Sequence, residues 1–254
     1  MSELVQSVIQ AMMVGDLALS GLKLASVTAK NNNRIRSLIL TSLFTLCLSQ
    51  VLSSLAPAFD VYYAYMMNMA GSYLQLIGII LVVYLLYIRT STIHQIDRKL
   101  QYFSWSIGSV MIVLLVVVRV VNTVNDTNKF NGEAGYFSNN VRQVLRVGLN
   151  VWSAIAILYF ETYTTRRITQ ITMSKLDQST YMYGMSLSVL ISGIFVTQSV
   201  LQLIRVFYST FTFAPFFAMG WSLSLKRIVE FKEELMRSSE NKTTTSHTIS
   251  SYKV

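Results

Sequence analysis

The sequence predicts an all-α, polytopic membrane protein built as a bundle of seven transmembrane helices. Of its 254 residues, 52% are hydrophobic and only 13% are charged, which is about half the charged fraction of a soluble domain. Apolar stretches of about 20 residues recur along the chain, and each is long enough to cross a hydrocarbon core of about 30 Å. Pro57 and Pro215 are the only prolines, so long helices can continue without a break.

Helices are expected because, in lipid, every backbone amide must be hydrogen-bonded within its own segment. The predicted spans are 4–28, 36–56, 61–89, 102–124, 141–164, 181–204 and 208–226. The apolar run that holds the last two spans is too long to cross once. We therefore expect a hairpin with its reversal near 205–212 and Pro215 in the first turns of the returning helix, where a missing amide hydrogen costs least.

The first span carries polar side chains at membrane depth. Gln6, Gln10, Asp16, Ser20 and Lys23 fall within about 140° of one helical face, so this face must look away from lipid. Asp16 lies about halfway along the span, where an ion costs about 2.5 to 3.5 kcal/mol. It is expected to be protonated, paired with a cation or facing a wet cavity, and Lys23 is two turns away.

Three later spans carry similar polar stripes. The stripe of 61–89 also contains small residues that permit close helix contact, which makes this span the candidate central helix. Its members are Asn68, Gly71, Ser72, Gln75 and Gly78. The other two stripes are Arg142, Arg146, Asn150 and Ser153 in the fifth span, and Gln198, Gln202 and Arg205 in the sixth. Such residues either hydrogen-bond between helices or line a ligand site.

The cations orient the predicted bundle. Fifteen of the 21 Lys and Arg residues lie in the connections 29–36, 89–99 and 166–175 or after residue 225. Because cationic loops stay on the cytoplasmic side, the amino terminus is expected outside and the carboxyl terminus in the cytoplasm. The plasma membrane is expected rather than an internal membrane. These loops account for most of the net charge of +9, so no nucleic-acid partner is needed.

Four arginines, Arg119, Arg142, Arg146 and Arg205, lie in the outer third of three spans. A guanidinium group binds carboxylate and phosphate groups with two parallel hydrogen bonds. Convergence of these side chains therefore predicts recognition of a small anionic molecule, whereas separate contacts with lipid phosphates are the alternative. The predicted ligand-binding residues are Asp16, Asn68, Gln75, Arg119, Arg146, Asn150, Gln202 and Arg205.

The predicted domains are a transmembrane domain over 1–228, a cytoplasmic amphipathic helix over 229–237 and a disordered Ser/Thr-rich tail over 238–254. The inner loops and the tail are the expected contact for a cytoplasmic signalling partner. Asn125-Asp126-Thr127 is an N-glycosylation sequon in a loop expected outside, so Asn125 is the predicted glycan acceptor.

The sequence lacks the histidine and cysteine patterns of common catalytic and metal sites. The only histidines are His94 and His247, and neither lies in a predicted span. Haem ligation by paired histidines, an HExxH zinc site and a serine–histidine dyad inside the membrane are therefore unsupported. Cys47 is the only cysteine, which excludes an intrachain disulfide. No enzyme activity, cofactor or metal is expected.

Two function classes remain. The first is a receptor, because the layout of outer arginines, cationic inner loops and Ser/Thr tail resembles that of G-protein-coupled receptors. The resemblance is one of topology. Tyr87-Ile88-Arg89 stands where the rhodopsin-like family has an acid-Arg-aromatic triplet, and Ala214-Pro215-Phe216-Phe217 where it has Asn-Pro-x-x-Tyr. We therefore assign no family.

The alternative is a small-solute transporter or channel with two helix triplets joined by a fourth helix, an arrangement seen in sugar-efflux carriers. Asp16 would then be a coupling or substrate residue in the first triplet. A weak internal repeat agrees with this arrangement: the second and sixth spans end in the similar segments SQVLSSLAPAF and QSVLQLIRVF. The tail, the loops and the outer arginines favour the receptor.

Overall fold

The computed structural model describes residues 2–26, 33–93, 98–171, 175–203 and 217–228, and the described chain is almost entirely helical. This confirms the all-α prediction. The helices are α1 (Ser2–Ser26), α2 (Asn33–Leu55), α3 (Val61–Ile93), α4 (Arg98–Phe130), α5 (Asn139–Ile171) and α6 (Lys175–Leu203). A short 3-10 turn, η1 (Ala56–Ala58), joins α2 to α3, and residues 217–228 form a further helical segment.

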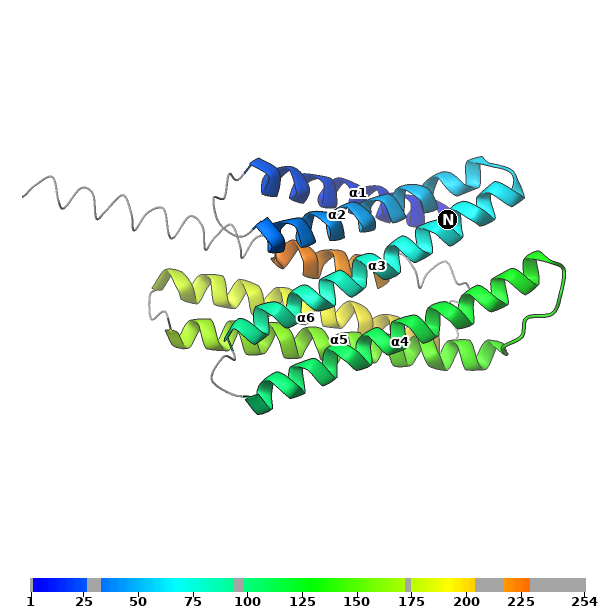
Figure 1. Ribbon diagram of the computed structural model, residues 1–254. Helices are drawn as coiled ribbons and strands as arrows, with labels where there is room; N and C mark the ends of the chain where they lie inside the picture. Colours follow the sequence, from blue (N-terminus) through cyan, green and yellow to red (C-terminus); the bar gives the residue numbers. More distant parts are fainter. Residues whose placement is uncertain (1, 27–32, 94–97, 172–174, 204–216, 229–254) are drawn as a thin grey trace, which may run out of the picture.

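The six labelled helices run alternately in opposite directions along one bundle (Figure 1). At one end, on the right in the figure, α2 leads into α3 and α4 leads into α5. We call this end of the bundle the α4–α5 end. Helix α3 contacts α2, α4 and α5, and α5 contacts α3, α4 and α6. Buried apolar residues from all six helices and from 217–228 form one continuous core.

Four segments are long and apolar enough to cross a membrane: Ser37–Ala58, Val61–Ile88, Lys99–Phe130 and Asn139–Thr162. They match the second to fifth predicted spans. The apolar stretches of α1 and α6 are shorter, at Ala11–Leu22 and Met185–Leu201. The expected reversal at 205–212, the amphipathic helix at 229–237 and the tail all lie outside the described residues. The seven-span count and the direction of the chain therefore stay predictions.

Three helices of the bundle extend further than predicted. Helices α3, α4 and α5 have 33 residues each, which corresponds to about 50 Å at 1.5 Å per residue. Helix α4 continues to Phe130 instead of ending at 124. Its last two turns are polar. Thr127 there is hydrogen-bonded to Tyr65 of α3, and Asp126 is paired with Arg142 of α5. A helix supported in this way can continue beyond the hydrocarbon core.

Helices α2 and α3 approach closely at small residues, as the stripe of 61–89 predicts. A Cβ atom added at Gly78 would lie 2.7 Å from Cγ of Leu46 and 2.9 Å from Oγ1 of Thr45. Ser42 Oγ donates a 3.0 Å hydrogen bond to the carbonyl oxygen of Gly78. The backbones can meet at this distance only because residue 78 has no side chain.

The most enclosed element is the segment 217–228, in which no residue is exposed. Trp221 and Leu225 are fully buried, and the rings of Phe217 and Trp221 pack against Phe195 of α6. A Cβ atom at Gly220 would collide with the Phe195 ring. Helix α3, the candidate central helix, contacts α2, α4 and α5 but is less enclosed than this segment. Helix α3 leaves Tyr73, Ile77 and Tyr84 exposed on one side, since it lies at the edge of the bundle there.

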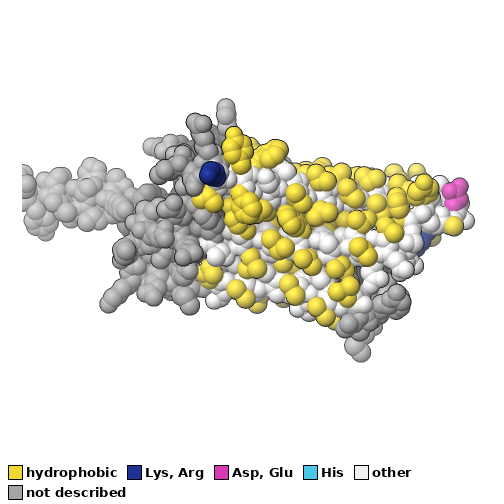
Figure 2. Space-filling model, turned by 90° about the horizontal axis from the view of Figure 1, so that it is seen from below, with side chains coloured by type: hydrophobic (Ala, Val, Ile, Leu, Met, Phe, Trp, Pro, Cys, Tyr) yellow, Lys and Arg dark blue, Asp and Glu magenta, His cyan; other side chains and the backbone are white. Residues whose placement is uncertain are grey.

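The surface of the bundle is mostly apolar. Figure 2 shows hydrophobic side chains along the described body of one face, with charged side chains visible only near its two ends. Large exposed residues such as Phe44, Trp105, Val113 and Val144 lie on different helices. A face of this kind is stable in lipid, so the described helices belong to an integral membrane protein.

Candidate functional site

The candidate site is a group of polar residues near the α4–α5 end of the bundle, which we call the α4–α5 cluster. It consists of Arg119, Asn122 and Asp126 on α4 and of Arg142 and Arg146 on α5. The α4 members are spaced three and four residues apart, and the α5 members four apart. Each set therefore lies on one helical face, and the two faces meet because α4 contacts α5.

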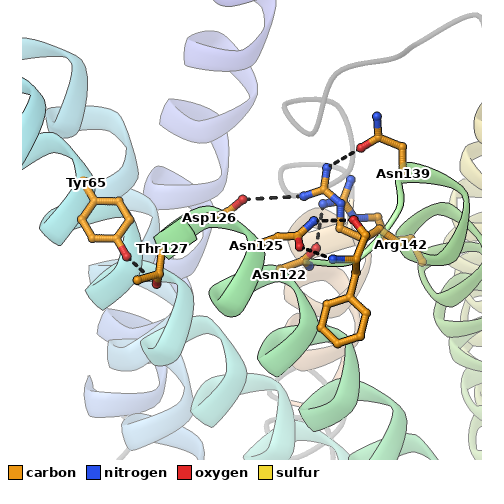
Figure 3. Close-up of polar contacts among 9 residues, drawn as sticks. Tyr65, Asn122, Asn125, Asp126, Thr127, Asn139 and Arg142 are labelled. Atoms are coloured by element: carbon orange, nitrogen blue, oxygen red, sulfur yellow. Dashed lines mark hydrogen bonds and ion pairs between the residues drawn. The ribbon is translucent and has the colours of Figure 1, made fainter. Parts of the chain in front are cut away.

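Arg142 is 7% exposed and has two partners. Its Nη2 atom donates a 3.0 Å hydrogen bond to Oδ1 of Asn139, and its Nη1 atom lies 3.7 Å from Oδ1 of Asp126. Figure 3 shows Arg142 extended between these two side chains, one from each helix. The Asp126 side chain is 49% exposed, so this ion pair lies at the boundary between the bundle interior and its surroundings.

Arg146 and Arg119 lie in the same region as Arg142, so these arginines converge as one of the two predicted alternatives requires. Nη2 of Arg146 donates a 2.9 Å hydrogen bond to Oδ1 of Asn122. Arg146 also interacts electrostatically with Arg142, Arg119 and Asp126, and Arg119 does so with Asp126 and Tyr73 of α3. Three of the four predicted outer arginines thus share one region. The fourth, Arg205, lies outside the described residues.

The electrostatics of the α4–α5 cluster are unbalanced. Within the described residues it contains three guanidinium groups and one carboxylate. Like charges repel one another strongly where the surroundings exclude water, and taking a cation out of water costs several kcal/mol unless it is well paired. The arrangement is therefore suited to holding an additional negative charge.

Two hydrogen bonds from tyrosines fix α4 to α3 beside the cluster. The Tyr65 hydroxyl lies 2.8 Å from Oγ1 of Thr127, as Figure 3 shows, and the Tyr73 hydroxyl lies 3.3 Å from Oγ1 of Thr123. The Tyr65 ring also stacks on Phe130 with centroids 4.3 Å apart. The polar end of α4 is thus held on two sides, by α3 and by α5.

Asn125 clamps the loop between α4 and α5. Its Nδ2 atom donates a 2.9 Å hydrogen bond to the Phe137 carbonyl oxygen, and the Phe137 amide donates a 2.7 Å bond to its Oδ1 atom. The side chain is 1% exposed. Glycosylation attaches sugar to the Asn nitrogen, which is here buried and engaged. A glycan at this atom would have to displace the clamp, so the predicted acceptor has a structural role in the folded chain.

The other predicted site residues fall in different surroundings. Asn150 is fully buried one turn beyond Arg146, and Gln75 is buried on α3. Asn68 is exposed on α3, away from the buried polar residues of the bundle. The side chain of Gln202 is not among those described.

Asp16 is paired with a cation, which is one of the three states expected for it. The partner is Lys226 in the segment 217–228, with Nζ 2.7 Å from Oδ1. The sequence did not identify this partner: Lys23 is two turns away but can reach the inner surface instead, and Lys226 was placed among the inner cations. Asp16 lies on α1, and its ion pair with Lys226 involves no member of the α4–α5 cluster, so these two predicted features form separate sites.

The sequence pattern alone did not identify several of the polar residues that the bundle brings together or buries. Asn122 and Asp126 follow Arg119 at helical spacing, and this signal could have identified the α4 half of the cluster. Glu161, near the end of the fifth predicted span, and Arg227, among the predicted inner cations, are 1% and 2% exposed. Burial of these two charges depends on contacts between distant helices, which no local pattern shows.

No protein-family model, curated protein or solved structure matches this chain.

Proposed function

We propose that this chain is a seven-span, receptor-like membrane protein that recognises a small anionic ligand from the outer side. The observation that carries the proposal is the α4–α5 cluster, in which Arg142 is paired with Asp126 and Arg119 and Arg146 lie within the electrostatic influence of that carboxylate. A carboxylate or phosphate on the ligand offsets the unbalanced charge, and guanidinium groups bind such anions in a fixed geometry.

The proposed orientation places the cluster outside. The alternating helices put the α4–α5 connection at the opposite end of the bundle from the connections that contain most of the cations (Figure 1). By the positive-inside rule that cationic end faces the cytoplasm, where it is available to a signalling partner. The α4–α5 end then faces the outer medium, with the plasma membrane as the proposed location.

Seven crossings require α1, α6 and the chain around 217–228 to span the membrane together with the four long helices. The close packing of 217–228 among apolar residues supports its place inside the bundle. Epitope tags at the two ends of the chain test this count in intact cells. Accessibility of the amino-terminal tag alone is expected, and accessibility of both tags from one side would overturn the topology.

The anion site is tested by thermal unfolding of the purified protein in detergent micelles. Succinate, butyrate and inorganic phosphate are compared with chloride at equal ionic strength. At least one of these oxyanions should raise the unfolding midpoint of the wild type, because a ligand that binds only the folded state stabilises it. Arg119→Gln and Arg146→Gln should lose this rise. Lys129→Gln, an exposed cation on the same helix, should keep it.

Two results would remove the anion site from the proposal. One is a midpoint that none of the oxyanions raises above that in chloride. The other is an equal response in Arg146→Gln and Lys129→Gln, since a general effect of anions on a cationic protein does not depend on position.

The transporter alternative has one observation in its favour. The Asp16–Lys226 pair joins two helices far apart in sequence and remains about one third exposed on each side chain, as expected of a pair that a solute or proton can reach. Solute flux into proteoliposomes that Asp16→Asn abolishes would support transport. Binding of an anion without flux would favour the receptor.

A further inference from the structure

Asn150 stands out among the buried polar residues of α5. It is fully buried, and neither its amide nitrogen nor its oxygen has a hydrogen-bond partner among the described residues. It lies four residues after Arg146 and eight after Arg142, on the same helical face. The opposite face of α5 is exposed at Val144, Gly148 and Val151, so the Asn150 side chain belongs to the interior of the bundle.

The neighbours of Asn150 on this face do have partners. Arg146 is bonded to Asn122, and Ser153 Oγ donates a 2.7 Å hydrogen bond to the Leu149 carbonyl oxygen. Buried polar groups are nearly always hydrogen-bonded, because leaving one unsatisfied costs about 1–3 kcal/mol. The Asn150 amide carries this cost of a missing hydrogen bond, and it lies next to the excess positive charge of the α4–α5 cluster. A bound anion with a further polar group can supply the missing hydrogen bonds.

We propose that Asn150 binds the hydroxyl group of a small hydroxycarboxylate whose carboxylate is held by Arg146. This inference rests on the proposed function and specifies the ligand of that site. An amide has two donors and an acceptor, and a hydroxyl group both donates and accepts. A hydroxyl therefore satisfies Oδ1 and Nδ2 together, whereas a carboxylate only accepts and an ammonium group only donates.

The spacing of Arg146 and Asn150 on α5 sets the distance between the carboxylate and the hydroxyl group of the ligand. Residues four apart on a helix have Cβ atoms roughly 5–6 Å from each other. The hydroxyl must therefore lie a few bonds from the carboxylate. Malate and 3-hydroxybutyrate have this separation, and succinate and butyrate are the matched acids that lack the hydroxyl.

The two pairs of acids are compared on the wild type and on Asn150→Leu in the same thermal unfolding assay. In the wild type, the hydroxy acid of at least one pair should bind about tenfold more tightly than its partner. Asn150→Leu should remove this difference and keep the response to succinate or butyrate, since its arginines are intact. Equal responses to both members of each pair in the wild type would overturn the inference.

The ligand-free protein provides a separate readout. Leucine has nearly the shape of asparagine, so Asn150→Leu should leave the unfolding midpoint unchanged or raise it. A drop of several degrees would mean that the amide is already bonded in the free protein, and this result too would overturn the inference. The anion site would still stand if Arg146→Gln abolishes the response to succinate. If no acid shifts the wild-type midpoint, the proposed function and this inference fail together.

Discussion

Lys226 lies 210 positions after Asp16 in the chain, yet its Nζ atom is 2.7 Å from the Asp16 carboxylate. The ion pair joins α1 to the segment 217–228, and two thirds of each side chain is shielded from its surroundings. It connects the first helix of the bundle with the last helical segment described. Neither charge is therefore isolated at membrane depth, where an unpaired ion is costly.

We expect Asp16→Asn and Lys226→Gln each to lower the free energy of unfolding by about 1 kcal/mol, the upper end for a partly exposed pair. Because both changes remove the same interaction, the double variant should lose less than the sum of the two. Unfolding of the purified protein by heat or denaturant measures these values. Strictly additive losses would show that the pair contributes nothing, and Glu133→Gln, at an exposed acid, is the control.

Asn125→Ala is expected to release the loop between α4 and α5. It removes two hydrogen bonds to Phe137 and leaves a partly buried backbone donor and acceptor to find new partners, which costs at most about 1–3 kcal/mol per group. Limited proteolysis at the loop should become faster, whereas Asn131→Ala, at an exposed loop position, should not change it. A glycosidase-sensitive mobility shift of the wild-type protein that Asn125→Ala abolishes would show instead that the Asn125 nitrogen carries a glycan and that its two hydrogen bonds to Phe137 do not form.

Gly78→Ala should destabilise the contact between α2 and α3. The added methyl group would meet Leu46 and Thr45 at less than 3 Å, and overpacking of this kind typically costs about 1–3 kcal/mol. Gly148→Ala on α5 is the matched control, since nothing lies within 4 Å of its Cβ position. Alanine favours helix over glycine by up to about 1 kcal/mol, so the control should be neutral or stabilising. Equal midpoints for the two variants would contradict the close packing.

Asn122→Ala should weaken the α4–α5 cluster without removing a charge. Arg146 would lose its 2.9 Å hydrogen bond to Asn122, and a bond to a charged group contributes about 1.5–3 kcal/mol. The unfolding midpoint should fall, and the response to anions should change because one hydrogen bond that orients the guanidinium is lost. A midpoint equal to that of Asn131→Ala would show that Asn122 does not support Arg146.

Several features of the fold could be predicted because they depend on local pattern. Helices over 36–56, 61–89, 102–124 and 141–164 follow from runs of apolar residues, and each corresponds to a helix that can span a membrane. The close approach of α3 to α2 follows from Gly71 and Gly78 on one face. Helix ends were less predictable, since α4 continues to Phe130 on contacts that come from other helices.

Residues that look alike in the sequence have different surroundings in the bundle. Asn68 and Gln75 belong to one polar stripe, yet Asn68 is exposed and Gln75 is buried. The sequon suggests that Asn125 is accessible, whereas its side chain is buried against Phe137.

The sequence by itself determined that this chain forms apolar helices with charged residues at particular depths, because hydropathy and helical periodicity are properties of neighbouring residues. Only the tertiary structure decided which charges meet. Arg119, Arg142 and Arg146 converge because α4 and α5 lie side by side, and Asp16 pairs with Lys226 because α1 lies next to 217–228. The energy of a buried charge depends on what faces it across the bundle, and that neighbour is set by packing between helices distant in sequence.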